Sequence, residues 1–270
     1  MPISEQLIDV KGNTVRYYEA GEPHHRSLLL LHGGFGDAWL HWSDIITELE
    51  EDYHLVAPDL PGYGQSTPLA GLTIDKLLTW TLDLMDALGL DQAGIVGQSF
   101  GGLVGRLLAS QYPNRIPVLI LVNGGVIPSV PGAARFLARL PGVGRFMFKR
   151  IARSTSSRSG LDGVFEDSDL LTDEFVQRVG INANGLAALM QALAVSPVPE
   201  KRTPRIPVLL LWGEEDAITP RIVGEHIHKN IPDSKLSLIA NCRHMPHLET
   251  QEIFVWQVKN FLDELTRSLR

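Results

Sequence analysis

The pentapeptide GQSFG at residues 97–101 limits what this chain can fold into more than any other stretch. It follows the apolar run 93–96 and precedes the helical run 103–112. This context predicts a strand, a sharp turn and a helix, with the serine in a strained backbone conformation that the flanking glycines permit. Ser99 is then expected at a helix N-terminus, where backbone N–H groups and the helix dipole stabilise developing negative charge. The five residues alone leave open a buried turn serine that caps its helix.

Composition and charge define the broad class of protein. The 270 residues are 44% hydrophobic and 20% charged, which is typical of a soluble globular protein. A formal net charge of −7 argues against nucleic acid as the main partner, because phosphate binding needs a clustered positive surface. The lone Cys242 cannot form an internal disulfide, and the amino terminus lacks the basic and apolar regions of a signal peptide. The apolar runs are too short for an integral membrane segment, so we expect a cytoplasmic protein.

Strand and helix patterns alternate along most of the chain. Short continuous apolar runs predict buried strands, and stretches with helical spacing follow them. We therefore expect an α/β fold with a mostly parallel central sheet of about eight strands flanked by helices. In such a sheet the ligand crevice lies beyond the carboxyl ends of the strands. The expected strands are 6–10, 14–19, 27–31, 54–57, 93–96, 118–122, 208–212 and 236–239, and the expected core helices are 37–50, 74–88, 103–112, 221–230 and 249–269.

The alternation stops between about residues 124 and 205. This stretch has no long β-branched run, and residues 136–140, 145–152 and 172–193 predict helices separated by proline, glycine and serine. We therefore expect two units. Residues 1–123 and 206–270 form an α/β core, and residues 124–205 form a helical cap inserted after the sixth strand.

Part of the expected cap is strongly basic. Residues 135–158 contain six arginines and Lys149 but no acidic residue, and apolar residues lie between them. The simplest interpretation is a lid whose apolar face covers an acyl or aryl pocket while its charges face water. Attraction to an anionic substrate or to an anionic membrane surface is the alternative.

The serine needs partners, because a hydroxyl is a poor nucleophile at neutral pH without a base and an acid that orients the base. His244 and His247 lie in the loop after the last expected strand, where a side chain reaches the crevice. Residues 214–216, Glu-Glu-Asp, follow the strand 208–212 in the corresponding position. The chain order serine, acid, histidine accompanies a serine turn on this kind of sheet. The spacing does not choose between the two histidines, and Asp216 also suits a helix cap.

Five stretches together resemble the motifs of an α/β-hydrolase of the small, single-cap kind. They are HGGFG at 32–36, PDLPGYGQS at 58–66, GQSFG at 97–101, WGEED at 212–216 and HMPHLE at 244–249. The resemblance implies that Ser99 is the nucleophile, Asp216 the orienting acid and His244 the base of a hydrolase that uses no cofactor and no metal. It also implies that His247 is a second, non-catalytic histidine. Arg243 departs from the pattern, because the family usually has glycine just before the base.

The same resemblance implies an oxyanion hole. Its donors are the backbone N–H of Phe100, the residue after the nucleophile, and the backbone N–H of Gly34. Phe35 is the alternative to Gly34 as a donor and is also expected to contact the substrate.

The reaction class follows from the family members that the motifs exclude. A serine at the turn counts against haloalkane dehalogenases and epoxide hydrolases, which use an aspartate there. We therefore expect a serine hydrolase that cleaves a small or medium carboxylic ester or lactone through an acyl-enzyme. Residues 164–174 with Arg178 loosely resemble the cap of carbon–carbon bond hydrolases of aromatic degradation, whose arginine helps hold the substrate, so that reaction is the alternative. A ligand-binding protein on a hydrolase scaffold is the third.

Overall fold

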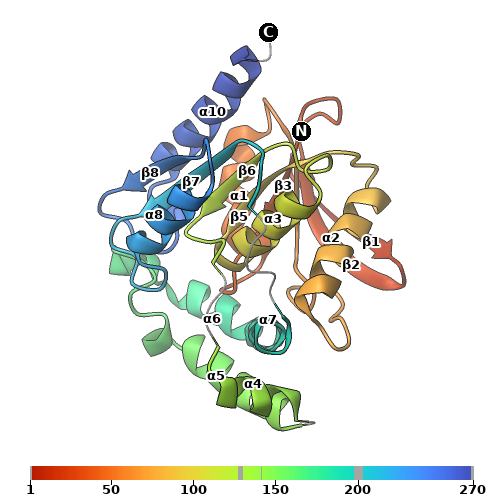
Figure 1. Cartoon of the computed structure of the whole chain (residues 1–270), viewed down its shortest axis with the longest axis vertical. Coiled ribbons are helices and arrows are strands. Elements are labelled where there is room, and N and C mark those ends of the chain that lie inside the picture. Colours follow the sequence, from red (N-terminus) through yellow and green to blue (C-terminus); the bar gives the residue numbers. More distant parts are fainter. Residues whose placement is uncertain (1, 127–129, 141, 198–202, 269–270) are drawn as a thin grey trace.

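The computed structural model describes residues 2–126, 130–140, 142–197 and 203–268 (Figure 1). They form one eight-stranded sheet in the order β1-β2-β4-β3-β5-β6-β7-β8. The pairs β1/β2 and β2/β4 are antiparallel and all other neighbours are parallel, so the predicted fold class is confirmed. The strands are β1 Ser4–Val10, β2 Asn13–Ala20, β3 Ser27–Leu31, β4 His54–Pro58, β5 Gly94–Gln98, β6 Leu119–Val122, β7 Val208–Gly213 and β8 Lys235–Ile239.

Alternation along the buried strands divides the core into two layers. In β3, Leu29 and Leu31 face one hydrophobic cluster, whereas Leu28 and Leu30 face the other. The first cluster is covered by α2 Ile74–Ala87, α3 Ser99–Gln111 and α8 Arg221–Asn230, and the second by α1 Ala38–Leu49 and α10 Gln251–Ser268. Because helices cover both faces, the central strands are mostly apolar on both sides, as the sequence predicts, and the polar Ser27 and Gln98 lie at the ends of β3 and β5.

The topology brings four strand ends together at one edge of the sheet. Strands β5, β6, β7 and β8 are consecutive neighbours and parallel, so their carboxyl ends lie side by side. The segments that follow them begin at residues 99, 123, 214 and 240. This edge is where the fold positions a site.

The described residues between β6 and β7 form four α-helices, α4 Gly132–Arg139, α5 Val143–Thr155, α6 Asp173–Ile181 and α7 Ala183–Val195. Two short 3-10 helices, Arg158–Gly160 and Ser168–Leu170, lie between α5 and α6. The prediction of one helix over 172–193 is wrong, because the helix is interrupted at Asn182. The Asn182 side chain accepts a hydrogen bond from the Gly64 N–H at 2.8 Å and donates one to the Arg178 carbonyl at 3.0 Å. These bonds tie the break between α6 and α7 to a loop of the core. In the described part of the chain, no helix has the length and apolar character needed to cross a membrane.

Candidate active site

Ser99 is the first residue of α3, directly after β5. Its φ is +49°, the strained conformation that the sequence predicts. A non-glycine residue in this region costs about 1–3 kcal/mol, so the surrounding structure must impose it. Gly124 packs directly on the turn, because a Cβ at that position would lie 2.4–2.7 Å from backbone atoms of Ser99. The turn therefore holds the serine at the N-terminus of α3, where N–H groups are unpaired by the helix.

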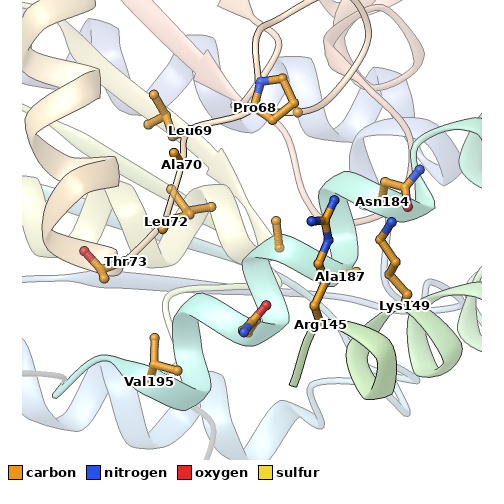
Figure 2. A pocket seen from close by; sticks show the side chains of 14 residues that line it. Pro68, Leu69, Ala70, Leu72, Thr73, Arg145, Lys149, Asn184, Ala187 and Val195 are labelled. Atoms are coloured by element: carbon orange, nitrogen blue, oxygen red, sulfur yellow. The ribbon is translucent and has the colours of Figure 1, made fainter. Parts of the chain in front are cut away.

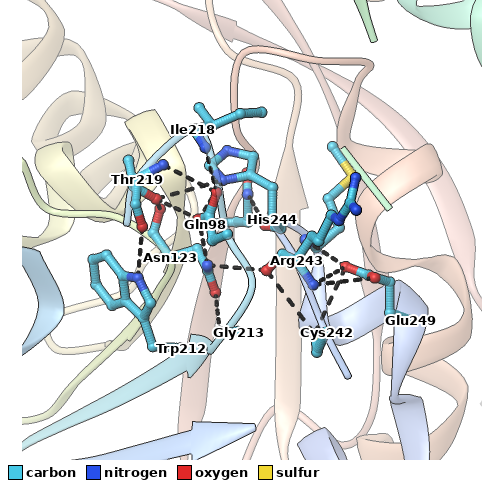
Figure 3. Close-up of polar contacts among 12 residues, drawn as sticks. Gln98, Asn123, Trp212, Gly213, Ile218, Thr219, Cys242, Arg243, His244 and Glu249 are labelled. Carbon is cyan, nitrogen blue, oxygen red and sulfur yellow. Dashed lines mark hydrogen bonds and ion pairs between the residues drawn. The ribbon is translucent and has the colours of Figure 1, made fainter. Parts of the chain in front are cut away.

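Asp216, after β7, and His244, after β8, form a buried pair (Figure 3). Asp216 Oδ2 lies 2.9 Å from His244 Nδ1 and also accepts hydrogen bonds from Asn123 Nδ2 and Thr219 Oγ1, both at 2.5 Å. The other oxygen, Oδ1, accepts the backbone N–H groups of Ile218 and Thr219 at 2.7 and 3.0 Å. Burial by itself raises the pKa of Asp216, but these hydrogen bonds and His244 outweigh it and lower the pKa. The acid is thus held ionised and fixed in orientation.

Sequence reasoning did not identify Asn123 as part of this site. It follows β6, has φ +43° and is fully buried. Besides Asp216, its Nδ2 reaches the Arg243 carbonyl at 3.1 Å, and its Oδ1 accepts the Gly213 N–H at 3.1 Å. One side chain therefore joins the acid, the base loop and the end of β7. Its position directly after an apolar strand is the signal that points to it.

His247 occupies a different environment from His244. It is fully buried, its Nε2 lies 3.1 Å from His41 Nδ1, and its ring lies on Trp42 with ring centroids 4.8 Å apart. Burial, and the neighbouring histidines to a lesser degree, lower the pKa of His247 well below the usual value. Of the two histidines that the sequence left open, only His244 contacts Asp216 among the described residues.

Gln98 links the serine turn to the base loop. Its Nε2 donates to the His244 carbonyl at 2.9 Å, and its Oε1 is buried without a partner among the described residues. Gly33 lies against this amide, because a Cβ there would be 1.9 Å from Gln98 Oε1 and 3.2 Å from Ser99 Cβ. Within the described residues, no hydrogen bond joins Ser99 Oγ to His244. Such bonds are often long in unliganded enzymes and tighten with substrate.

The loop 33–36 lies beside both Ser99 and His244. Its carbonyls are bound by side chains: Tyr63 donates its hydroxyl to the Gly34 oxygen at 3.2 Å, and His41 Nε2 lies 2.6 Å from the Phe35 oxygen. Among the described residues, no acceptor takes the N–H of Gly34 or of Phe100. The Phe35 ring lies 6.4 Å from the His244 ring, centroid to centroid. The residues predicted as oxyanion donors and substrate contact therefore come together around the serine and the histidine.

Arg243, which departs from the family pattern, connects the base loop to the helical segment. Its Nε lies 2.6 Å from Glu166 Oε2, and its backbone N–H donates to Glu249 Oε1 at 3.0 Å. The next N–H, that of His244, donates to the Val164 carbonyl at 3.0 Å. The Arg243 side chain thus forms an ion pair with the helical segment that a glycine at this position could not form.

Arg178 pairs with a carboxylate of the core. Its Nε lies 3.0 and 3.1 Å from the two Asp37 oxygens, and Arg16 also reaches Asp37 at 3.4 Å. Arg16 in turn holds the fully buried Asp59 at 2.5 Å. Arg178, which the family resemblance associated with substrate binding, is therefore part of an ion-pair network that anchors α6 to the core.

A cavity of about 560 Å³ lies between the loop 68–73, α7 and α5 (Figure 2). Its lining includes Arg145 and Lys149 of α5 and Asn184 of α7, but not Ser99, Asp216 or His244. Leu186, on the opposite face of α7, instead approaches Gly34, to within 2.9 Å of a Cβ built there. The cavity is therefore separate from the Asp–His pair. In the described part of the chain, no group of three or more His, Cys, Asp or Glu side chains is arranged to hold a metal ion.

A mostly parallel sheet that presents a serine, an aspartate and a histidine from neighbouring strand ends is the architecture of a hydrolase of the α/β class. A family model described as the alpha/beta hydrolase fold matches residues 26–251. The chain therefore belongs to that family, as the five motifs predict.

Its named relatives have different activities. The chain is 28% identical to 3-oxoadipate enol-lactonase 2 of Acinetobacter baylyi over 249 residues, which cover 91% of both proteins. It is 26% identical to a 2-hydroxy-6-oxononadienedioate/2-hydroxy-6-oxononatrienedioate hydrolase of Burkholderia vietnamiensis, over 92% of this chain and 90% of that protein. Among solved structures, an enol-lactonase from Burkholderia xenovorans matches with a TM-score of 0.76 and 22% identity, over 96% of this chain and all of that chain. At that identity the structural match shows the fold alone.

Proposed function

We propose that this protein is a serine hydrolase that cleaves a small or medium carboxylic ester or lactone through an acyl-enzyme. The observation that carries the proposal is the buried pair of His244 and Asp216 beside a strained Ser99 at the N-terminus of α3. A structural serine has no need of a positive φ, and a structural histidine has no need of a carboxylate that accepts five hydrogen bonds. Together they are the parts of an activated nucleophile.

We assign a role to each ring nitrogen of His244. Asp216 occupies Nδ1 of His244, so Nε2 is left to take the proton from Ser99 Oγ as that oxygen attacks the substrate carbonyl. The imidazolium then protonates the leaving alcohol or enol oxygen, and the acyl group stays on Ser99. Water, deprotonated by the same nitrogen, attacks the acyl-enzyme and releases the acid. Asp216 remains ionised throughout, which agrees with the direction of its pKa.

The tetrahedral intermediates carry a negative oxygen that needs donors. We assign this role to the N–H groups of Phe100 and Gly34, with Phe35 as the alternative second donor. The support is that the Gly34 and Phe35 carbonyls are already bound by Tyr63 and His41, which fixes the loop before substrate arrives. We also assign Phe35 a contact with the substrate, because its ring lies beside that of His244.

The helical segment 124–205 is proposed to act as a cap over this site. Two contacts support that role: the Val164 carbonyl accepts the His244 N–H, and Phe35 packs with Phe165 and Phe175 in one hydrophobic cluster. This cluster includes Phe35, whose ring lies beside that of His244, and its apolar character suits an acyl or aryl group.

Carbon–carbon bond hydrolysis is the second candidate, and a relative of that activity is 26% identical to this chain. The enol-lactonase relative, at 28%, favours the lactone or ester. Arg178 supports this order, since its Nε is paired with Asp37 and it lines a hollow with Arg16 and Gln65 that includes neither Ser99 nor His244. We therefore place ester or lactone hydrolysis first.

A labelling experiment tests the proposal. A fluorophosphonate probe is applied to the wild type and to Ser99→Ala, His244→Ala and His247→Phe, each checked for folding by circular dichroism. We expect labelling of the wild type and of His247→Phe, no labelling of Ser99→Ala and at least about a hundredfold slower labelling of His244→Ala. An unlabelled wild type, or a labelled Ser99→Ala, overturns the assignment.

Substrate class is measured in the same preparations. A series of p-nitrophenyl esters and simple lactones is compared with a 2-hydroxy-6-oxo-dienoic acid. Higher kcat/KM for the esters or lactones supports our proposal, whereas a preference for the dienoic acid replaces it with carbon–carbon bond hydrolysis.

A further inference from the structure

Helices α4 and α5 form the end of the molecule opposite α10 (Figure 1). We refer to residues 132–139 and 143–155 as the basic helix pair. The two helices pack closely, because a Cβ at Gly144 would lie 2.4 Å from the Ala138 carbonyl oxygen. The pair joins the rest of the molecule through α7, against which Phe148 and Ala152 of α5 are buried.

Every charged side chain of the basic helix pair is positive. It contains five arginines and one lysine and no acidic residue, in a chain whose formal net charge is −7. Among the described residues, none of these six cations forms an ion pair, whereas Arg158, just beyond the pair, is bound to Asp173 at 2.5 Å. Unpaired like charges on two adjacent short helices repel one another, so they are unfavourable for the isolated fold. An anionic partner would remove that cost. The six cations are Arg135, Arg139, Arg145, Lys149, Arg150 and Arg153.

The face of α5 that points away from α7 is both basic and apolar. Val143, Phe146, Arg150 and Arg153 follow one another at intervals of three or four residues, on the side opposite Phe148. Phe146 is 71% exposed and Val143 is 45% exposed. On α4, Phe136 is 65% exposed and lies between Arg135 and Arg139 in the sequence.

This arrangement corrects the simple lid interpretation. A lid that turns its apolar face to the pocket and its charges to water accounts for Phe148, but it leaves Phe136 and Phe146 in water. Two of the cations, Arg145 and Lys149, face inward and line the cavity beside α7 (Figure 2). The outer face therefore consists of exposed aromatic rings flanked by cations. Arg145 and Lys149 do not belong to it.

We propose that the outer face of the basic helix pair binds the surface of an anionic lipid bilayer. Cations attract anionic headgroups, and aromatic and aliphatic side chains beside them insert at the boundary between headgroups and acyl chains. A nucleic acid would satisfy the charges but would leave Phe146 and Phe136 without an apolar environment. A second copy of this chain would cover the rings but would oppose two identical positive faces.

Vesicle flotation with the full-length protein tests this binding. The vesicles contain phosphatidylcholine alone or with about 30% phosphatidylglycerol, at low and at high salt. We expect binding to the anionic vesicles only, with a marked loss as salt rises from about 0.05 to about 0.5 M. Arg150→Gln with Arg153→Gln should weaken partitioning about thirtyfold, because each cation near an anionic surface contributes roughly five- to sixfold. Phe146→Ser should weaken it about tenfold with little change in salt dependence.

The matched control is Lys229→Gln with Arg267→Gln, which removes the same charge from α8 and α10. Partitioning of this control within about threefold of the wild type supports a localised site. The proposal is overturned if the wild type binds neither kind of vesicle, binds both equally, or loses binding equally in the control. It is also overturned if sedimentation without lipid reveals a dimer that Phe146→Ser abolishes, or if duplex DNA binds more tightly than the anionic vesicles. Thermal unfolding of each variant excludes loss of fold as the cause.

Discussion

His244 and His247 lie three residues apart and are both buried, yet the structure places them in opposite surroundings. His244 faces Asp216, whose carboxylate accepts hydrogen bonds from the side chains of Asn123 and Thr219 as well. His247 faces another histidine, His41, and an indole ring. The second surroundings oppose a positive charge on His247 and lower its pKa. Burial alone therefore does not distinguish the two histidines, whereas their neighbours do.

The surroundings of His244 and those of His247 both include the same loop of the core, residues 33–36. His41 contacts His247 through Nδ1 and the Phe35 carbonyl through Nε2, so the two buried histidines support the loop 33–36. Burial and the charge that His32 would carry lower the pKa of His41 to about 3. A pair that stays neutral keeps a fixed hydrogen-bond pattern, whereas His244 is paired with a carboxylate, that of Asp216.

The largest effect should come from removing the charge that distinguishes the two histidines. Asp216→Asn keeps the size of the side chain but favours the wrong tautomer of His244, so we expect kcat to fall by about 10³- to 10⁴-fold. The matched control is Glu215→Gln, next in the chain, whose Oε2 accepts only the Cys242 N–H at 3.0 Å. Steady-state hydrolysis of the best p-nitrophenyl ester measures both. A loss below about tenfold in Asp216→Asn would show that Asp216 does not orient the base.

The second prediction concerns how the buried histidines His41 and His247 affect the stability of the fold at acidic pH. In the folded protein the pKa values of His41 and His247 lie far below the unfolded value near 6.5, so the unfolded chain binds more protons once the pH falls under about 6.5. Stability should therefore decrease from about pH 6.5 downward, by about 1.4 kcal/mol per pH unit for each histidine that stays neutral. Urea unfolding between pH 7 and pH 5 measures this slope. His247→Phe should flatten it, whereas Gln in place of the exposed His226 should not, and equal slopes in the wild type and His247→Phe would contradict the prediction.

The sequence predicted the sheet and the serine turn from continuous apolar runs, and it predicted where Asp216 and His244 lie because each is in a loop after an expected strand. The run before Asp216 is apolar throughout, whereas β8, before His244, also contains a lysine and a serine. It did not predict Asn123 or Gln98, since a single Asn or Gln next to a strand carries no periodic signal and acts only through contacts between distant segments. The break at Asn182 was missed for the same reason, because the hydrogen bond to Gly64 joins two segments that lie far apart in the sequence. Exposure of Phe146 also depended on which face of α5 packs on α7, and exposure of Phe136 on which face of α4 packs on α5 and α7. An amphipathic pattern decides neither.

A smaller effect should follow from cutting the contact between the serine turn and the base loop. Gln98→Met retains the length of the side chain but cannot donate to the His244 carbonyl, so that buried oxygen loses its partner. We expect kcat to fall about tenfold and the free energy of unfolding to fall by about 1–3 kcal/mol. Gln92→Met is the control, because Gln92 also donates to a carbonyl, that of Asn114 at 2.8 Å, far from the site. If both variants behave alike, Gln98 does not position His244.

The smallest effect should come from the ion pair of Arg243 and Glu166. Both side chains are about one-third or more exposed, at 34% and 41%, so solvent screens their attraction and we expect a coupling of only about 0.2–1 kcal/mol. A double-mutant cycle with Arg243→Ala and Glu166→Ala, measured by urea unfolding, gives this value. Hydrolysis should stay within about threefold of the wild type, because the loop is also held by the backbone N–H groups of Arg243 and His244, which these substitutions leave in place. A tenfold fall in kcat that the charge swap Arg243→Glu with Glu166→Arg restores would instead show that the helical segment positions the base through this pair. The contrast between His244 and His247 would then depend on the helical segment as well as on Asp216.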